Sequence, residues 1–172
     1  MKINYSLSEE HEYLLFEQIR TINATSRFTE SRQYMQHGTT SVYMHSLSVA
    51  YLSCLLAERF NLQVDWHSMI RGAILHDYFL YDWHVKDASH RLHGFHHPAK
   101  ALKNAREDFQ LNNREAFIIL RHMFPLTPIP PSSTEGWIVC LADKICSSFE
   151  TFHQPAIGSG YISAFFHSGS IC

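Results

Sequence analysis

The stretch Ile70-Arg-Gly-Ala-Ile-Leu-His-Asp77 is the most informative part of this chain of 172 residues. Its apolar residues recur at the spacing of one face of a helix. Asp65 is a typical N-cap residue, so we expect this helix to run from Trp66 to about Asp77. Adjacent helix residues point about 100° apart, so His76 and Asp77 can both reach one metal ion only near a helix end.

Helical patterns extend outward from this stretch over most of the chain. We expect further helices at about 8–23, 40–60, 98–109, 113–122 and 134–152. Residues 78–96 are aromatic and rich in histidine, and they indicate a long loop over a site. The proline-rich residues 124–131 cannot form a helix interior, because proline lacks the amide donor. No alternating strand pattern of any length occurs, so the sequence predicts an all-α fold, a helical bundle.

The length suits one domain with short appendages. We expect residues 1–35 to form an N-terminal helix that packs on the core. Residues 36–152 are expected to form the metal-binding helical domain. Residues 153–172 form a weakly patterned C-terminal tail to which we assign no element.

The composition excludes several classes of function. The net charge is -2, so no basic field favours a nucleic-acid polymer as partner. No apolar run reaches the roughly 18 residues of a membrane span, and the N-terminus has no signal-peptide pattern. The four cysteines form no CxxC pair, which favours free thiols and a cytoplasmic location. The sequence carries no pattern that specifies an oligomeric state.

Histidine and aspartate occur at positions that look buried. Asp143 lies in an apolar helix, where an unpaired charge is costly, so it needs a partner. We place His45 in the interior of the helix over 40–60, within its apolar stripe. An ordinary core histidine is the alternative interpretation of His45. A cation shared by His45, the pair His76-Asp77 and Asp143 would satisfy all four groups.

These residues resemble the HD superfamily, which is named after its pattern H…HD…D on a helical bundle. The matching pieces are Val42-Tyr-Met-His45, Ala73-Ile-Leu-His-Asp77 and Leu141-Ala-Asp-Lys144. The resemblance covers roughly residues 36–150. It implies an all-α bundle of the HD-domain type and a metal-dependent phosphohydrolase that acts on a nucleotide or another small phosphoester. Leu80 stands where many HD enzymes carry a lysine.

Some members of the superfamily hold a second metal with two further histidines, and His97 and His122 stand in the corresponding order. On this resemblance, Asp77 is the catalytic residue and bridges two ions. The first ion would be held by His45, His76, Asp77 and Asp143, and the second by Asp77, His97 and His122. The alternatives are a surface imidazole for His97 and a helix C-terminal cation for His122. His93 and His96 compete with His97 for the ligand position.

Imidazole-rich ligands favour Fe, Mn, Co, Ni or Zn over Mg. Two such divalent ions can share a hydroxide that attacks phosphorus in line. Lys144 and Arg121 are candidates to bind the phosphate of a small phosphorylated substrate. His93 and His96 are candidates to protonate the leaving oxygen.

Two other functions remain open at this point. A di-iron oxygenase would use the same kind of site, and a non-catalytic ligand-binding module would keep metal for stability. The aromatic loop over 78–96 is compatible with ligand binding, although aromatic residues more often close a core or pocket. We expect the segment Pro125–Pro131 to wall the site rather than to dock a partner.

Overall fold

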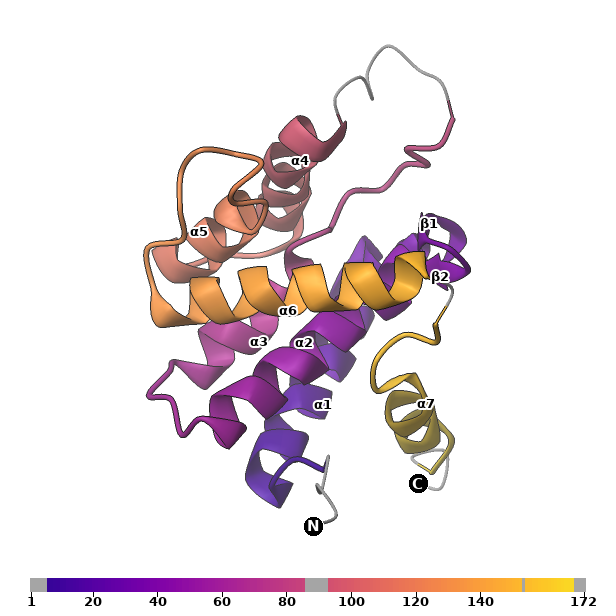
Figure 1. Ribbon diagram of the computed structural model, residues 1–172. Coiled ribbons are helices and arrows are strands. Elements are labelled where there is room, and N and C mark those ends of the chain that lie inside the picture. Colours follow the sequence, from indigo (N-terminus) through magenta and orange to yellow (C-terminus); the bar gives the residue numbers. More distant parts are fainter. Residues whose placement is uncertain (1–5, 86–92, 153, 169–172) are drawn as a thin grey trace.

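The computed structural model describes residues 6–85, 93–152 and 154–168 (Figure 1). In chain order, these residues form α1 (Glu9–Thr25), η1 (Arg27–Gln33), β1 (Met35–His37), β2 (Thr40–Ser41), α2 (Val42–Arg59), α3 (Trp66–Leu75), α4 (His93–Asp108), α5 (Asn113–Arg121), α6 (Thr134–Thr151) and α7 (Ser159–Ser168). The predicted all-α class is confirmed. The regular β structure in the described part of the chain is one short antiparallel hairpin, β1–β2.

Polar side chains start α3 and α5 where the sequence predicted them. The Asp65 carboxylate accepts a hydrogen bond from the Ser68 amide at the start of α3. Asn112 caps α5, and the Glu115 carboxylate accepts a hydrogen bond from the backbone N–H of Asn112, which completes a capping box. These bonds satisfy backbone donors that have no partner within the helix.

Helix α4 differs from its prediction. The sequence indicated a start at Pro98, whereas the helix begins at His93 and contains Pro98. The proline removes one backbone donor, so α4 carries a missing hydrogen bond near its start. Of the loop predicted over 78–96, residues 86–92 lie outside the described part, and residues 93–96 are helical.

The core lies between α2 and α3, which pack against each other; α6 covers α2, and α5 covers α3 (Figure 1). Leu15 of α1 and Ile162 of α7 belong to the same core cluster. Helix α7 lies in the tail to which the sequence assigned no element, and its Phe165 ring stacks on Phe16. This long-range contact explains a helix that the local pattern did not indicate. Among the described residues, no helix is long and apolar enough to span a membrane.

Helices α3 and α5 approach closely one turn before each ends. A Cβ atom on Gly72 would lie 2.9 Å from both the Cδ1 and Cγ2 atoms of Ile118. His76 follows Gly72 by one turn, and His122 follows Ile118 by one turn. The missing side chain of Gly72 therefore allows the two helix ends to meet, and the two imidazole ring centroids lie 4.8 Å apart.

Gly72→Ala should lower the free energy of unfolding. Alanine gains up to about 1 kcal/mol of helix propensity over glycine, whereas overpacking a core costs about 1–3 kcal/mol. Because both crowded atoms belong to one buried, branched side chain, we expect a net loss of about 1 kcal/mol. Gly160→Ala is the matched control, since a Cβ there meets nothing within 4 Å. Denaturant unfolding compares the two variants, and equal stability would contradict the close approach.

Candidate metal centre

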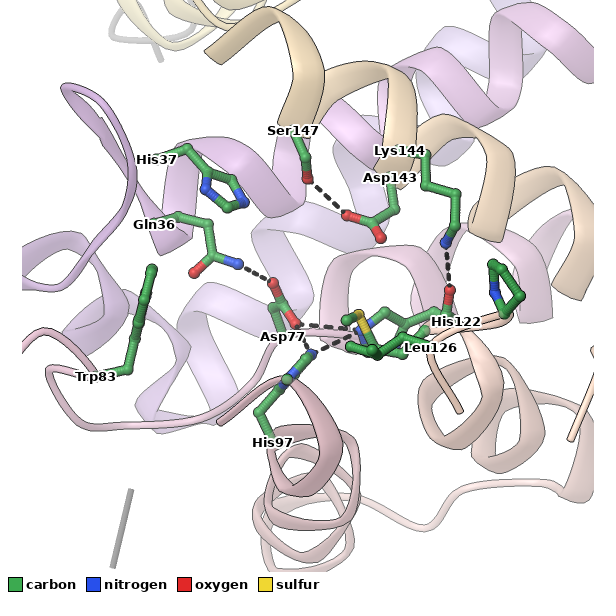
Figure 2. Close-up of a pocket in the computed structure, with 13 residues that line it drawn as sticks. Gln36, His37, Asp77, Trp83, His97, His122, Leu126, Asp143, Lys144 and Ser147 are labelled. Carbon is green, nitrogen blue, oxygen red and sulfur yellow. Dashed lines mark hydrogen bonds and ion pairs between the residues drawn. The ribbon is translucent and has the colours of Figure 1, made fainter. Parts of the chain in front are cut away.

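The six candidate metal ligands, of which Figure 2 labels Asp77, His97, His122 and Asp143, lie buried at one place, where the ends of several helices meet. They are His45 of α2, His76 and Asp77 at the end of α3, His97 of α4, His122 at the end of α5, and Asp143 of α6. One placement differs from expectation: His45 lies in the first turn of α2 rather than in the helix interior. The helix begins later than predicted because residues 40–41 pair in the hairpin.

The two carboxylate oxygens of Asp77 face two different pairs of histidines. Oδ2 lies 3.5 Å from Nε2 of His76 and 3.8 Å from Nε2 of His45. Oδ1 lies 3.1 Å from Nε2 of His97 and 3.5 Å from Nε2 of His122. A carboxylate placed in this way can contribute one oxygen to each of two neighbouring binding positions.

Asp143 adds a carboxylate to the binding position that is formed by His45, His76 and Oδ2 of Asp77. Its Oδ1 atom lies 3.2 Å from Nε2 of His45 and 3.8 Å from Nε2 of His76. The Ser147 hydroxyl donates to the same oxygen over 3.2 Å and so orients the carboxylate. Two groups of potential ligand atoms therefore lie within coordination range of each other: His45, His76 and Asp143, and His76, Asp77 and His122.

The imidazoles at the ends of α3 and α5 are held in the same way. Nδ1 of His76 lies 2.7 Å from the Ala73 carbonyl oxygen, and Nδ1 of His122 lies 2.8 Å from that of Ile119. Carbonyls of a last helical turn lack intrahelical partners, so they accept these bonds. Because Nδ1 must carry the hydrogen in each case, Nε2 presents its lone pair to the site.

Glu150, which the sequence analysis missed, holds the third imidazole. Its buried Oε2 atom accepts a hydrogen bond from Nδ1 of His45 over 2.8 Å, which again leaves Nε2 facing the site. Burial opposes protonation of His45, but hydrogen bonds to Asp143 and Glu150 outweigh it and raise its pKa to about 10. The local sequence signal for Glu150 was weak, since an acidic residue near a helix end is usually exposed.

The electrostatics of the site keep its carboxylates ionised. Burial by itself would raise the pKa of Asp77, but the neighbouring His76 and His97 hold that pKa far below its usual range. Asp143 has a similarly lowered pKa because His45 and His76 overcome the effect of burial. Burial, with His76 nearby, lowers the pKa of His122 to about 3. His122 is thus a neutral imidazole rather than a helix-terminal cation.

These residues fit a divalent metal ion. The Nε2 atom of His76 is buried and has no hydrogen-bond partner among the described residues, a costly state for a polar atom unless something binds it. Four imidazoles and two carboxylates surround the same space. Such a mixed nitrogen and oxygen donor set suits divalent metals of the first transition row.

Comparison with known protein families agrees with this geometry. The family model described as HD domain matches residues 42–147, which is more than half of the chain. The chain belongs to the HD domain family. HD domains bind divalent metals and are commonly metal-dependent hydrolases. No curated protein and no solved structure matches the chain.

The metal centre of this HD domain opens into a cavity of about 550 Å³. The residues that line it are Gln36, His37, Asp77, Trp83, Gly94, His97, His122, Met123, Pro125, Leu126, Asp143, Lys144 and Ser147. The proline-rich segment contributes Pro125 and Leu126, so it walls the cavity as we expected. Gln36 and His37 come from strand β1. The sequence analysis did not detect the β1–β2 hairpin because both of its strands are very short.

Of the two residues predicted to bind a phosphate, Lys144 lines the cavity and Arg121 does not. Lys144 lines the cavity, and its Nζ atom donates to the carbonyl oxygen of His122 over 3.0 Å. Arg121 lies outside that lining: its guanidinium donates to the Pro130 carbonyl and lies over the Phe117 ring. It projects away because adjacent helix residues point in different directions, and His122 takes the inward one.

Of the two histidines that competed with His97, the described one, His96, does not share its position. His96 is exposed on α4 and is not part of the cavity lining, whereas the His97 side chain is only 4% exposed. His93 begins α4, and its side chain lies outside the described part of the structure. The helical turn that directs His97 inward directs His96 outward.

Gln36→Leu should weaken metal binding. The Gln36 amide donates to Oδ2 of Asp77 over 2.6 Å and so fixes the carboxylate of the HD pair. Loss of such a supporting hydrogen bond typically costs about 10- to 100-fold in metal affinity. Competition with a chromogenic chelator measures the change. The exposed Gln33, two residues before β1, provides the matched control as Gln33→Leu. Equal metal affinity of the two variants would show that Gln36 does not support the site.

Proposed function

We propose that this HD domain is a metal-dependent phosphohydrolase that acts on a small phosphorylated substrate, such as a nucleotide or another phosphoester. The observation that carries the proposal is the Asp77 carboxylate, whose two oxygens face separate histidine pairs beside an open cavity. This arrangement suits two neighbouring divalent ions, and paired ions are typical of phosphoryl-transfer sites.

The distances between the ligand atoms suggest which residues would bind each of two ions. His45, His76, Asp77 and Asp143 would hold the first, and Asp77, His97 and His122 the second. The four imidazoles favour Fe, Mn, Co, Ni or Zn. Bound there, such an ion supplies Lewis acidity toward phosphoryl oxygens and lowers the pKa of a water molecule.

The chain's own side chains contribute position and charge. Lys144 brings a positive charge to the cavity wall within reach of a phosphoryl group beside His122. Ser147 orients Asp143, and Gln36 orients Asp77, so neither carboxylate needs to reorganise during reaction. Met123 and Leu126 form an apolar wall that excludes water from one side.

The proposal is tested with protein loaded separately with each of the five metals. Phosphate release from a panel of phosphomonoesters and phosphodiesters is measured, and oxygen consumption of the iron-loaded protein is followed with the same compounds. We expect metal-dependent phosphate release without oxygen consumption. Oxygen consumption without phosphate release would identify a di-iron oxygenase instead, and metal binding with neither reaction would favour a binding module.

A further inference from the structure

The cavity above the metal centre has two unlike walls (Figure 2). One carries Leu126 and Lys144. The other, which we call the hairpin wall, consists of Gln36, His37 and Trp83. Figure 2 shows the hairpin wall across the cavity from Lys144, with the carboxylate of Asp77 between the two sides. A substrate that reaches Asp77 therefore contacts both walls.

The Gln36 amide presents a buried acceptor. Its Nε2 atom donates to Oδ2 of Asp77 over 2.6 Å. An ionised carboxylate only accepts hydrogen bonds, so the amide nitrogen must face Asp77 and the oxygen must point the other way. That oxygen, Oε1, is buried and has no hydrogen-bond partner among the described residues. Buried acceptors are normally satisfied, so an N–H or O–H group of a ligand is the natural partner.

His37 and Trp83 complete the wall. Their ring centroids lie 6.5 Å apart at an angle of 68°, and both rings line the cavity. The neutral imidazole of His37 offers one donor nitrogen and one acceptor nitrogen, and the indole of Trp83 offers a flat apolar face. Gln36 and His37 precede residue 42, where the match to the HD family begins. The family pattern therefore does not account for these two side chains.

These properties point to a ligand with a particular chemistry. An unpaired acceptor beside an imidazole recognises hydroxyl groups, and an aromatic face packs on the C–H face of a saturated ring. Among the described residues that line the cavity, Lys144 is the single lysine or arginine. This cation suits a phosphoryl group of the ligand.

We propose that the hairpin wall binds the alcohol portion of the substrate and selects a hydroxylated ring of the sugar type that carries a phosphate. The position of the phosphate rests on the proposed function, whereas the recognition of hydroxyls rests on Gln36 and His37, and Trp83 contributes a packing face for the ring. The cavity volume of about 550 Å³ suits a ligand of this size.

Two matched compounds test the proposal on the metal-loaded protein. A methyl ribofuranoside that carries a phosphate ester on the hydroxyl of its exocyclic carbon is compared with tetrahydrofurfuryl phosphate, which has a similar ring without hydroxyls. The wild type should prefer the furanoside phosphate in kcat/KM by on the order of tenfold, because the other compound leaves a buried acceptor unpaired. Equal kcat/KM for the two compounds would overturn the proposal.

A variant of the hairpin wall tests where the selectivity arises. His37→Ala should lower kcat/KM more for the furanoside phosphate than for tetrahydrofurfuryl phosphate, so the ratio falls toward one. A purely structural defect would affect both compounds alike. His67→Ala makes the same change at an exposed position on α3 and should keep the wild-type ratio. An unchanged ratio in His37→Ala would refute the assignment.

Failure of the proposed function gives a different result. If the wild type releases phosphate from neither compound, calorimetric titration measures the binding of each compound to the metal-loaded protein. The furanoside phosphate should then bind more tightly by on the order of tenfold, and His37→Ala should remove the difference. Tighter binding without hydrolysis would reject the hydrolase and keep the subsite, whereas equal binding would reject the subsite.

Discussion

Asp77→Asn should reduce phosphate release by on the order of 10³-fold, because metal-ion stabilisation of a phosphoryl-transfer transition state is worth several kcal/mol. The substitution keeps the size of the side chain but removes the negative charge. It also replaces one of the two oxygens that face the histidine pairs with an amide nitrogen, which cannot bind a metal. Both binding positions are therefore affected by one change.

The measurement combines steady-state hydrolysis with metal analysis of the same samples. The Gln36 amide now faces a side chain without charge, so the orientation of residue 77 is also weakened. Asp82→Asn makes the same chemical change at a part-exposed position in the segment after α3 and should keep the wild-type rate. A fully active Asp77→Asn protein would refute the proposed metal-dependent mechanism.

His122→Ala should reduce the metal content from about two equivalents to about one, since the second position then keeps only His97 and one oxygen of Asp77. The first position retains His45, His76 and Asp143 and should stay loaded. Activity should fall along with the metal content, because paired ions act together on the phosphoryl group.

Elemental analysis after dialysis against a single metal gives the stoichiometry. His96→Ala is the matched control: it removes an exposed imidazole from the same histidine-rich region and should leave the metal content unchanged. If His122→Ala lowers the midpoint temperature of thermal unfolding but keeps the wild-type metal content, His122 has a packing role only. Loss of metal in the His96 variant instead would place the second position elsewhere.

Much of the fold follows from local signals that the sequence carries by itself. Asp65 and Asn112 start helices because their side chains satisfy backbone donors, and this requires no distant contact. The buried aspartate in an apolar helix, Asp143, indicated a cation or partner from burial cost alone. The order of histidines and aspartates was sufficient to show a resemblance to the HD family, and the chain belongs to that family.

Other features could not be predicted because they depend on contacts between distant residues. Helix α7 is stabilised by packing of Phe165 on Phe16, far away in the chain. The hairpin is too short to produce an alternating pattern, yet it brings Gln36 to Asp77. Glu150 looked like a solvent-facing residue, and only the packing of α6 on α2 shows that it holds His45.

The sequence by itself determined the helical class, the starts of α3 and α5 and the order of the candidate ligands, because capping, apolar spacing and the burial cost of charge act through near neighbours. The tertiary structure alone decided how these groups meet. The orientation of α4 about its axis places His97 in the site and His96 on the surface. The close approach of α3 and α5 at Gly72 brings the imidazoles of His76 and His122 together. Directions of side chains and distances between helices depend on how whole elements pack, and a linear pattern does not contain that information.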